Sequence, residues 1–152
     1  MDWREVDLEA RVWSVPADRI KAGRPHTVPL SDSAIALLKA TPHREGLVFP
    51  AQRGGQLSNT ALLQVCRRMG VDAVPHGFRS TFKDWARSCT RYPDEASELQ
   101  LAHVNSDQTR AAYARDQLLP MRARLMQDWA VFLSRPMADG EVVGIGKKAR
   151  AE

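Results

Sequence analysis

The chain has 152 residues, 43% of them hydrophobic, which is long enough for one domain with a core of its own. Its 22 Lys and Arg residues exceed its 18 Asp and Glu residues, and this modest positive charge suits a polyanionic partner without requiring one. Cys66 and Cys89 belong to no CxxC or HxxxH pattern, which argues against a disulfide framework and a zinc site. The sequence has neither an 18-residue apolar run nor a signal peptide, so we expect a soluble, cytoplasmic protein with no membrane partner.

Three short strands are predicted in the first third of the chain. Apolar and polar side chains alternate along residues 11–16, which is typical of a strand. A turn marked by Gly23 separates this strand from residues 25–30, a second strand whose two prolines favour the edge of a sheet. The segment Leu47 to Pro50 is predicted as the third strand. We therefore expect one small, three-stranded antiparallel sheet.

Two helices are predicted around the third strand. The first spans residues 31–40 and is capped by the serine at its start. The second spans residues 58–69, again with a serine cap, and Gly70 is its C-terminal stop. The buried stripe of this second helix is expected to contain Leu62, Leu63, Cys66 and Met69. Arg67 and Arg68 would then point partly outward, either into solvent or toward a phosphate.

The second half of the chain is predicted to be helical. A helix follows Pro75, and its core face is expected to contain Phe78, Phe82, Trp85 and Cys89. The next helix spans residues 94–101 with Asp94 as its cap, and a further helix begins at Asn105 or Ser106. The predicted fold class is α+β, mainly α.

Residues 117–134 form a predicted amphipathic helix. Its apolar stripe contains Leu118, Met121, Leu125, Trp129 and Phe132. Such a stripe must be buried, either within the chain or against a second copy, so this helix is a candidate for homo-oligomer formation. Residues 135–152 have no apolar periodicity, and we expect a disordered tail after a single domain that spans residues 1–134.

The segment from His76 to Tyr113 concentrates groups suited to phosphate chemistry. His76 and Arg79 are three residues apart, so a helix would place their side chains on one face, able to bind the same anion. His103 closes the next predicted helix, and Tyr113 lies about two turns into the one after it. A tyrosine hydroxyl, with an ordinary pKa of about 10, becomes a nucleophile only where neighbours take its proton or stabilise negative charge.

The order of these motifs resembles that of the tyrosine recombinases, the phage-integrase family. The matching pieces are HGFRST, which includes His76 and Arg79, then LAH ending at His103, then a T-x-x-x-Y segment ending at Tyr113. The opening hairpin is also similar to that of integrases from satellite phages and genomic islands, and the resemblance runs from about residue 2 to residue 134.

The resemblance implies the integrase catalytic-domain fold and site-specific DNA recombination through a 3′-phosphotyrosyl intermediate. No metal, cofactor or small-molecule substrate is implied, and the implied partner is double-stranded DNA. The implied catalytic residues are Lys21, His76, Arg79, His103 and Tyr113, with Lys21 as the general acid for the leaving 5′ oxygen. Arg24 and His26 either contact phosphate or face water, and Arg67 and Arg68 are further DNA-binding candidates.

Two departures from the family pattern bear on activity. The family's first catalytic arginine lies upstream of the tryptophan motif at which this sequence begins, and Arg4 follows that tryptophan. The DNA-gripping amino-terminal domains also have no counterpart here, so the resemblance implies a truncated catalytic domain with weak duplex binding and slow cleavage or none. Three hypotheses remain: an integrase catalytic fragment, a non-catalytic module that binds DNA or an intact integrase, and an unrelated helical DNA-binding protein.

Overall fold

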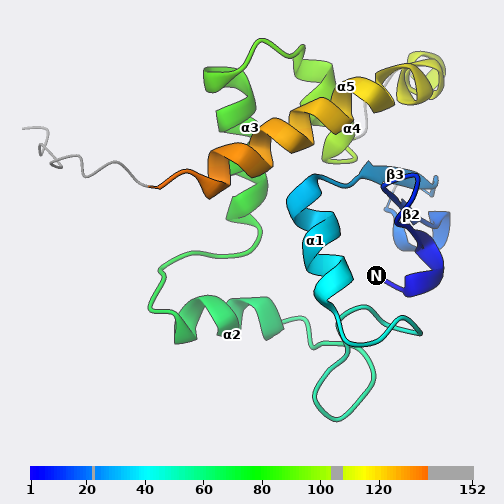
Figure 1. The fold of residues 1–152 in the computed structure, drawn as a ribbon. Coiled ribbons are helices and arrows are strands. Elements are labelled where there is room, and N and C mark those ends of the chain that lie inside the picture. Colours follow the sequence, from blue (N-terminus) through cyan, green and yellow to red (C-terminus); the bar gives the residue numbers. More distant parts are fainter. Residues whose placement is uncertain (22, 104–107, 137–152) are drawn as a thin grey trace, which may run out of the picture.

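Helices make up about half of the described residues. The computed structural model describes residues 1–21, 23–103 and 108–136, and for residues 108–117 it describes the backbone alone. Within these residues, five α-helices and two short 3₁₀ helices, Trp3–Glu5 and Ala17–Arg19, accompany one three-stranded sheet. Helices α3, α4 and α5 gather together, the sheet and α1 lie beside them, and α2 stands apart on extended loops (Figure 1). The α+β, mainly α fold class is confirmed.

The sheet is antiparallel with the order β1-β2-β3, formed by Val6–Asp7, Val12–Val15 and His26–Pro29. The two longer strands lie where the sequence predicted them, and the proline-containing strand β3 is at an edge as expected. The third predicted strand is wrong, because Leu47 forms only an isolated bridge with Asp2, and β1 takes its place. A tight turn brings β1 onto β2 with a short closed loop, which costs less chain entropy than recruiting a distant segment.

Helix α1, Asp32–Ala40, closes a small core beneath the sheet. The Ser31 hydroxyl accepts a hydrogen bond from the Ala34 amide at 3.3 Å, which confirms the predicted cap. The buried side chains of this core are Trp3, Leu38 and Val48. The Arg44 guanidinium lies 4.8 Å from the centre of the Trp3 ring, a cation–π contact that covers one side of the core.

A second, helical core lies between α3 (Gly77–Cys89), α4 (Asp94–Gln100) and α5 (Gln108–Ser134). Its buried side chains are Phe82, Trp85, Ala86, Ala96 and Leu125. The predicted core face of α3 is correct for Phe82 and Trp85 but wrong for Phe78, which is 54% exposed, and for Cys89, which is also exposed. These two residues belong to the first and last turns of α3, and the core covers only the turns between them.

Helix α5 is one continuous helix that includes Pro120, where the sequence suggested two elements. Its apolar stripe packs within the chain: Leu125 is fully buried, and the Trp129 ring meets Phe82 edge-on at a centroid distance of 5.6 Å. Phe132 stacks on Trp129 but remains 41% exposed. The predicted helix start at residue 105 or 106 lies outside the described residues, and so do residues 137–152 of the tail predicted for residues 135–152.

Helix α2 spans Ala61–Arg68 and begins after Thr60, so the predicted cap at Ser58 is two residues too early. Gly70, with φ +68°, ends it as expected. The predicted buried stripe is mostly wrong, because Cys66 is buried while Leu62 is 61% and Met69 is 71% exposed. The position of α2 away from the other helices leaves little of its apolar side against a packing surface (Figure 1). None of the helices in the described ranges is long and apolar enough to cross a membrane.

Candidate active site

The HxxR segment opens helix α3. His76 occupies the N-cap with helical backbone angles, and the Arg79 amide donates to the His76 carbonyl at 3.2 Å, so both residues belong to the same turn. Their side chains are exposed. The Arg79 guanidinium also reaches across to α4, where its Nη2 donates to the Leu101 carbonyl at 2.6 Å. This bond joins the start of α3 to the end of α4.

The end of α4 positions His103 through a tight C-terminal turn. The His103 amide donates to the Glu98 carbonyl at 3.0 Å, and the Ala102 amide donates to the Leu99 carbonyl at 3.1 Å. These two bonds form a Schellman motif, which requires a left-handed residue between helix and exit, and Ala102 has φ +53°. The side chain is also held, because His103 Nδ1 lies 2.6 Å from Glu98 Oε2. Glu98 therefore fixes both the backbone and the imidazole of His103.

The β-hairpin approaches the same end of α4. The ring Nε2 of His26, on β3, lies 3.4 Å from the Gln100 carbonyl. Arg122 of α5, which is 2% exposed, strengthens this junction by donating to the Gln100 side chain at 3.1 Å and to the Thr27 carbonyl at 2.6 Å. Lys21 is exposed in the turn that connects β2 to β3. The sheet, α4 and α5 thus meet beside the candidate residues.

An open pocket of about 480 Å³ lies at this junction. Its lining comes from the first residue, strands β2 and β3 with the connection between them, α3 and the end of α4: Met1, Trp13, Val15, Arg19, Ile20, His26, Val28, Arg79, Gln100, Leu101 and Ala102. Arg79 and His26 therefore share one concave surface, and His103 directly follows its last lining residue. Lys21 is next in sequence to Ile20, another lining residue.

The remaining candidates lie elsewhere or outside the description. Tyr113 belongs to α5, but its side chain is among those outside the described residues. Arg67 and Arg68 are exposed in the last turn of α2, and Arg24 is half-buried in the β2–β3 connection. The structure thus brings Arg79, His26 and the turn that carries His103 together, and it keeps the arginine pair on a separate helix.

A buried lysine that the sequence analysis did not single out supports the end of α4. The side chain of Lys83, on α3, is only 11% exposed and forms ion pairs with Glu98 and with Asp94, the latter at 2.8 Å. It also donates to the Ser97 hydroxyl at 2.8 Å. No local spacing in the sequence predicts this burial, because the carboxylate partners that a buried ammonium needs lie on another helix.

Asp94 acts as an ion-pair partner instead of the predicted cap. It is the first residue of α4 and follows Pro93 at the N-cap, and its carboxylate accepts hydrogen bonds from Arg87 and Lys83. These bonds, with Arg87 the larger contributor, hold the pKa of Asp94 well below its usual value of 3.8. Because the Asp94 carboxylate binds the cationic side chains of Arg87 and Lys83, it does not cap the backbone amides of α4.

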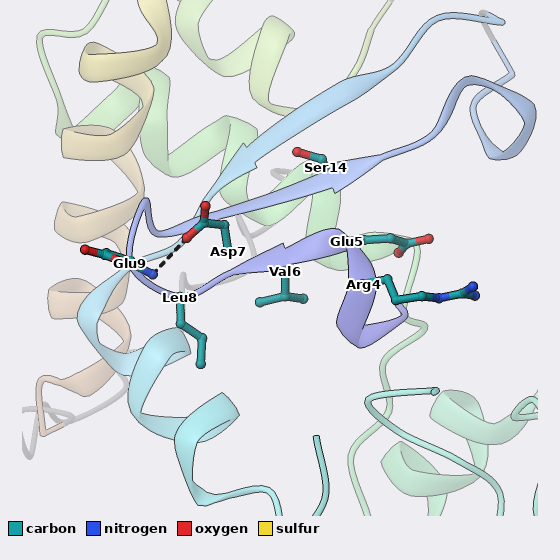
Figure 2. Close-up of a pocket in the computed structure, with 7 residues that line it drawn as sticks. All are labelled: Arg4, Glu5, Val6, Asp7, Leu8, Glu9 and Ser14. Carbon is teal, nitrogen blue, oxygen red and sulfur yellow. Dashed lines mark hydrogen bonds between the residues drawn. The ribbon is translucent and has the colours of Figure 1, made fainter. Parts of the chain in front are cut away.

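A second hollow lies on the outer side of β1 and is separate from the candidate residues. Its volume is about 550 Å³, and its lining residues are Arg4, Glu5, Val6, Asp7, Leu8, Glu9 and Ser14 (Figure 2). The Asp7 carboxylate accepts from the Glu9 amide at 2.9 Å, and Arg4 is paired with Asp2 at 2.9 Å. That pairing lowers the pKa of Asp2 to about 2. Arg4 thus lines a different hollow from Arg79.

Comparisons with known proteins give the family. The Phage integrase family pattern matches residues 1–118. The chain is 36% identical over 137 residues to prophage integrase IntA and 37% identical over 134 residues to prophage integrase IntZ, both of Escherichia coli K12. It is 33% identical over 141 residues to the integrase of Shigella phage Sf6.

These alignments cover 84%, 84% and 88% of this chain but only 32%, 33% and 36% of the relatives, so the chain spans about a third of their length. No solved structure matches the chain significantly. The family match covers most of the sequence and includes the HxxR and LxH motifs whose geometry is described above. The chain belongs to the phage integrase family.

Proposed function

We propose that this chain contains the DNA-cleaving residues of a site-specific recombinase, with Tyr113 as the nucleophile. The observation that carries the proposal is the 2.6 Å bond from Arg79 to the Leu101 carbonyl, which joins the HxxR turn to the turn that carries His103. A phosphate beside this junction would meet candidate side chains from two helices. Family membership supports the same chemistry, and the proposed substrate is double-stranded DNA in the cytoplasm.

Arg79 is the proposed charge clamp. Its guanidinium is always protonated and presents a planar pair of donors that fits two phosphate oxygens. The bond to Leu101 holds this side chain at the mouth of the pocket before DNA arrives. His76, in the same turn, and His103 are proposed to bind the remaining oxygens or to accept the tyrosine proton.

The reaction exchanges one phosphate ester for another. Tyr113 Oη attacks the phosphorus, its proton passes to a histidine, and the bond from phosphorus to the 5′ oxygen breaks. Lys21 is the proposed general acid that gives this leaving oxygen a proton, since it is exposed on the hairpin beside the pocket. The phosphotyrosyl link conserves the ester bond, so a 5′ hydroxyl from another strand can reverse the step without a cofactor or metal.

The proposed DNA contacts lie on two elements. Arg24 and His26 belong to the β2–β3 hairpin, while Arg67 and Arg68 lie on the exposed last turn of α2. Phosphate contacts release counterions, so each arginine replaced should weaken duplex binding and lower its salt dependence by about one unit of slope. Loss of Arg67 and Arg68 should not alter sequence preference, because phosphate contacts carry no base information.

The proposal can be tested with a nicked suicide substrate, a DNA duplex that carries the recombination site recognised by the protein. Cleavage traps the protein on DNA, so even slow reaction accumulates a covalent adduct on a denaturing gel. The chain has two tyrosines, which gives a matched control. Tyr92 donates to Asp128 at 2.8 Å, and its pKa is raised by burial and by that bond, so it is a poor nucleophile.

We expect adduct with the unmodified chain and with Tyr92→Phe, and none with Tyr113→Phe. An adduct that survives in Tyr113→Phe would refute the assignment of the nucleophile. Duplex binding without adduct over the full time course would refute cleavage and favour a non-catalytic DNA-binding module.

A further inference from the structure

A chain of charged contacts leads from the helical core to His103. Lys83 is paired with Glu98, and Glu98 Oε2 lies 2.6 Å from His103 Nδ1. The side chains become more exposed along this path, from 11% at Lys83 through 24% at Glu98 to 44% at His103. The path therefore connects the interior of the α3–α4 pair to the surface of the candidate site.

We infer that Glu98, held by the buried Lys83, is a positioning residue that fixes the ring orientation and the tautomer of His103. A carboxylate accepts hydrogen bonds, so the nitrogen facing it must carry a proton. In the neutral ring this places the proton on Nδ1 and leaves the lone pair on Nε2. His103 then presents Nε2 as the nitrogen able to accept the proton of Tyr113. The mechanistic part of this inference rests on the proposed function.

Glu98 is well suited to hold the ring in this form. Its partial burial acts to raise its pKa, but the hydrogen bonds from Lys83 and His103 outweigh burial, and the pKa lies below its usual value. The acceptor is therefore ionised at neutral pH. The hydrogen bond from the His103 amide to the Glu98 carbonyl is a second restraint. The backbone and the side chain of His103 are therefore both held by Glu98.

Lys83 supports the Glu98 carboxylate from the side of the helical core. The ammonium also contacts Asp94 and Ser97, so it is fixed from three sides inside the α3–α4 interface. A side chain with this many partners loses little further freedom when it binds Glu98. The carboxylate is thereby aimed outward at the imidazole.

The tautomer can be observed directly by NMR on protein labelled with ¹⁵N-histidine, at a pH where the ring is neutral. The chain has four histidines, and His103→Gln identifies the signals that belong to this ring. We expect the unmodified protein to show the Nδ1–H form. Glu98→Ala should shift the ring toward the Nε2–H form that a free histidine side chain prefers. Glu95→Ala, on the exposed side of the same helix, is the matched control and should leave the tautomer unchanged.

Cleavage of the suicide substrate supplies the second measurement. Loss of a group that orients a catalytic histidine should slow adduct formation by about 10- to 100-fold in Glu98→Ala, by analogy with residues that orient metal-bound histidines. Glu98→Gln can still accept from Nδ1–H through its amide oxygen, so it should retain the tautomer and recover part of the rate. Circular dichroism confirms that each variant is folded before comparison.

The two measurements separate this inference from the proposed function. An unchanged tautomer in folded Glu98→Ala would overturn the inference, whatever the DNA assay shows. A shifted tautomer with an unaltered cleavage rate would overturn the role of Glu98 in the reaction. A shifted tautomer in a protein that forms no adduct even when unmodified would support the positioning contact and refute the proposed function.

Discussion

Replacement of Leu125 by alanine tests the packing that anchors α5. Leu125 is fully buried among Phe82, Trp85 and Ala96 in the helical core. The substitution removes three buried carbons, worth about 2 kcal/mol in transfer free energy at roughly 0.8 kcal/mol each. Because the surrounding helices relax only partly, the cavity adds about 1–2 kcal/mol. We expect the free energy of unfolding to fall by about 3–4 kcal/mol.

Urea unfolding followed by circular dichroism measures this difference. Leu133→Ala, on the same helix but at a side chain that is 62% exposed, is the control and should change the free energy of unfolding by about 0.5 kcal/mol or less. A loss below about 1 kcal/mol in Leu125→Ala, or equal losses in the two variants, would show that α5 does not pack on α3 and α4 as described.

Three further predictions concern the turn after α4, the loss of stability at low pH, and the contacts of Arg122 between α5, α4 and the sheet. Ala102→Gly should stabilise the chain by about 0.5–1 kcal/mol, because glycine adopts the left-handed turn at φ +53° without the strain of a Cβ; a lowered melting temperature would contradict this. The lowered pKa of Asp94 contributes stability above its usual value of 3.8 that is lost as pH falls below it, so Asp94→Asn should be less stable at pH 7 and should flatten the acid limb of urea midpoints against pH. If the urea midpoints of the unmodified chain and of Asp94→Asn fell equally steeply with decreasing pH, the ion pairs of Asp94 would be refuted. Arg122→Met should cost about 1–3 kcal/mol, since it leaves the Oε1 atom of the buried Gln100 and the partly buried Thr27 carbonyl without this donor, whereas the exposed Arg124→Met should be neutral in the same urea assay.

Local signals in the sequence predicted the features that depend on a few neighbouring residues. The Ser31 cap, the stop at Gly70 and the hairpin strands all follow from side-chain hydrogen bonding, backbone freedom or alternation over a short segment. The HxxR turn belongs to the same class, because helical geometry alone places His76 and Arg79 together.

Features that depend on a distant partner were predicted less well. Periodicity identified the apolar sides of α2 and α3, but it could not show how much of each side meets another helix, so Met69 and Phe78 proved exposed. The left-handed turn at Ala102 could not be predicted from its residue type, because glycine usually occupies that position. The pairing of Lys83 with Glu98 joins two helices across 15 residues, and such a contact has no local spacing to reveal it.

The junction beside the pocket joins two parts of the fold that both carry candidate site residues. The sheet with α1 has its own core, and helices α3, α4 and α5 have another. Arg79 and His103 belong to the helical part, whereas His26 and Lys21 belong to the sheet. Under the proposed function, a chain whose two parts had not docked would keep these candidate residues apart. On that proposal, these residues would come together only when the two parts dock through Arg122.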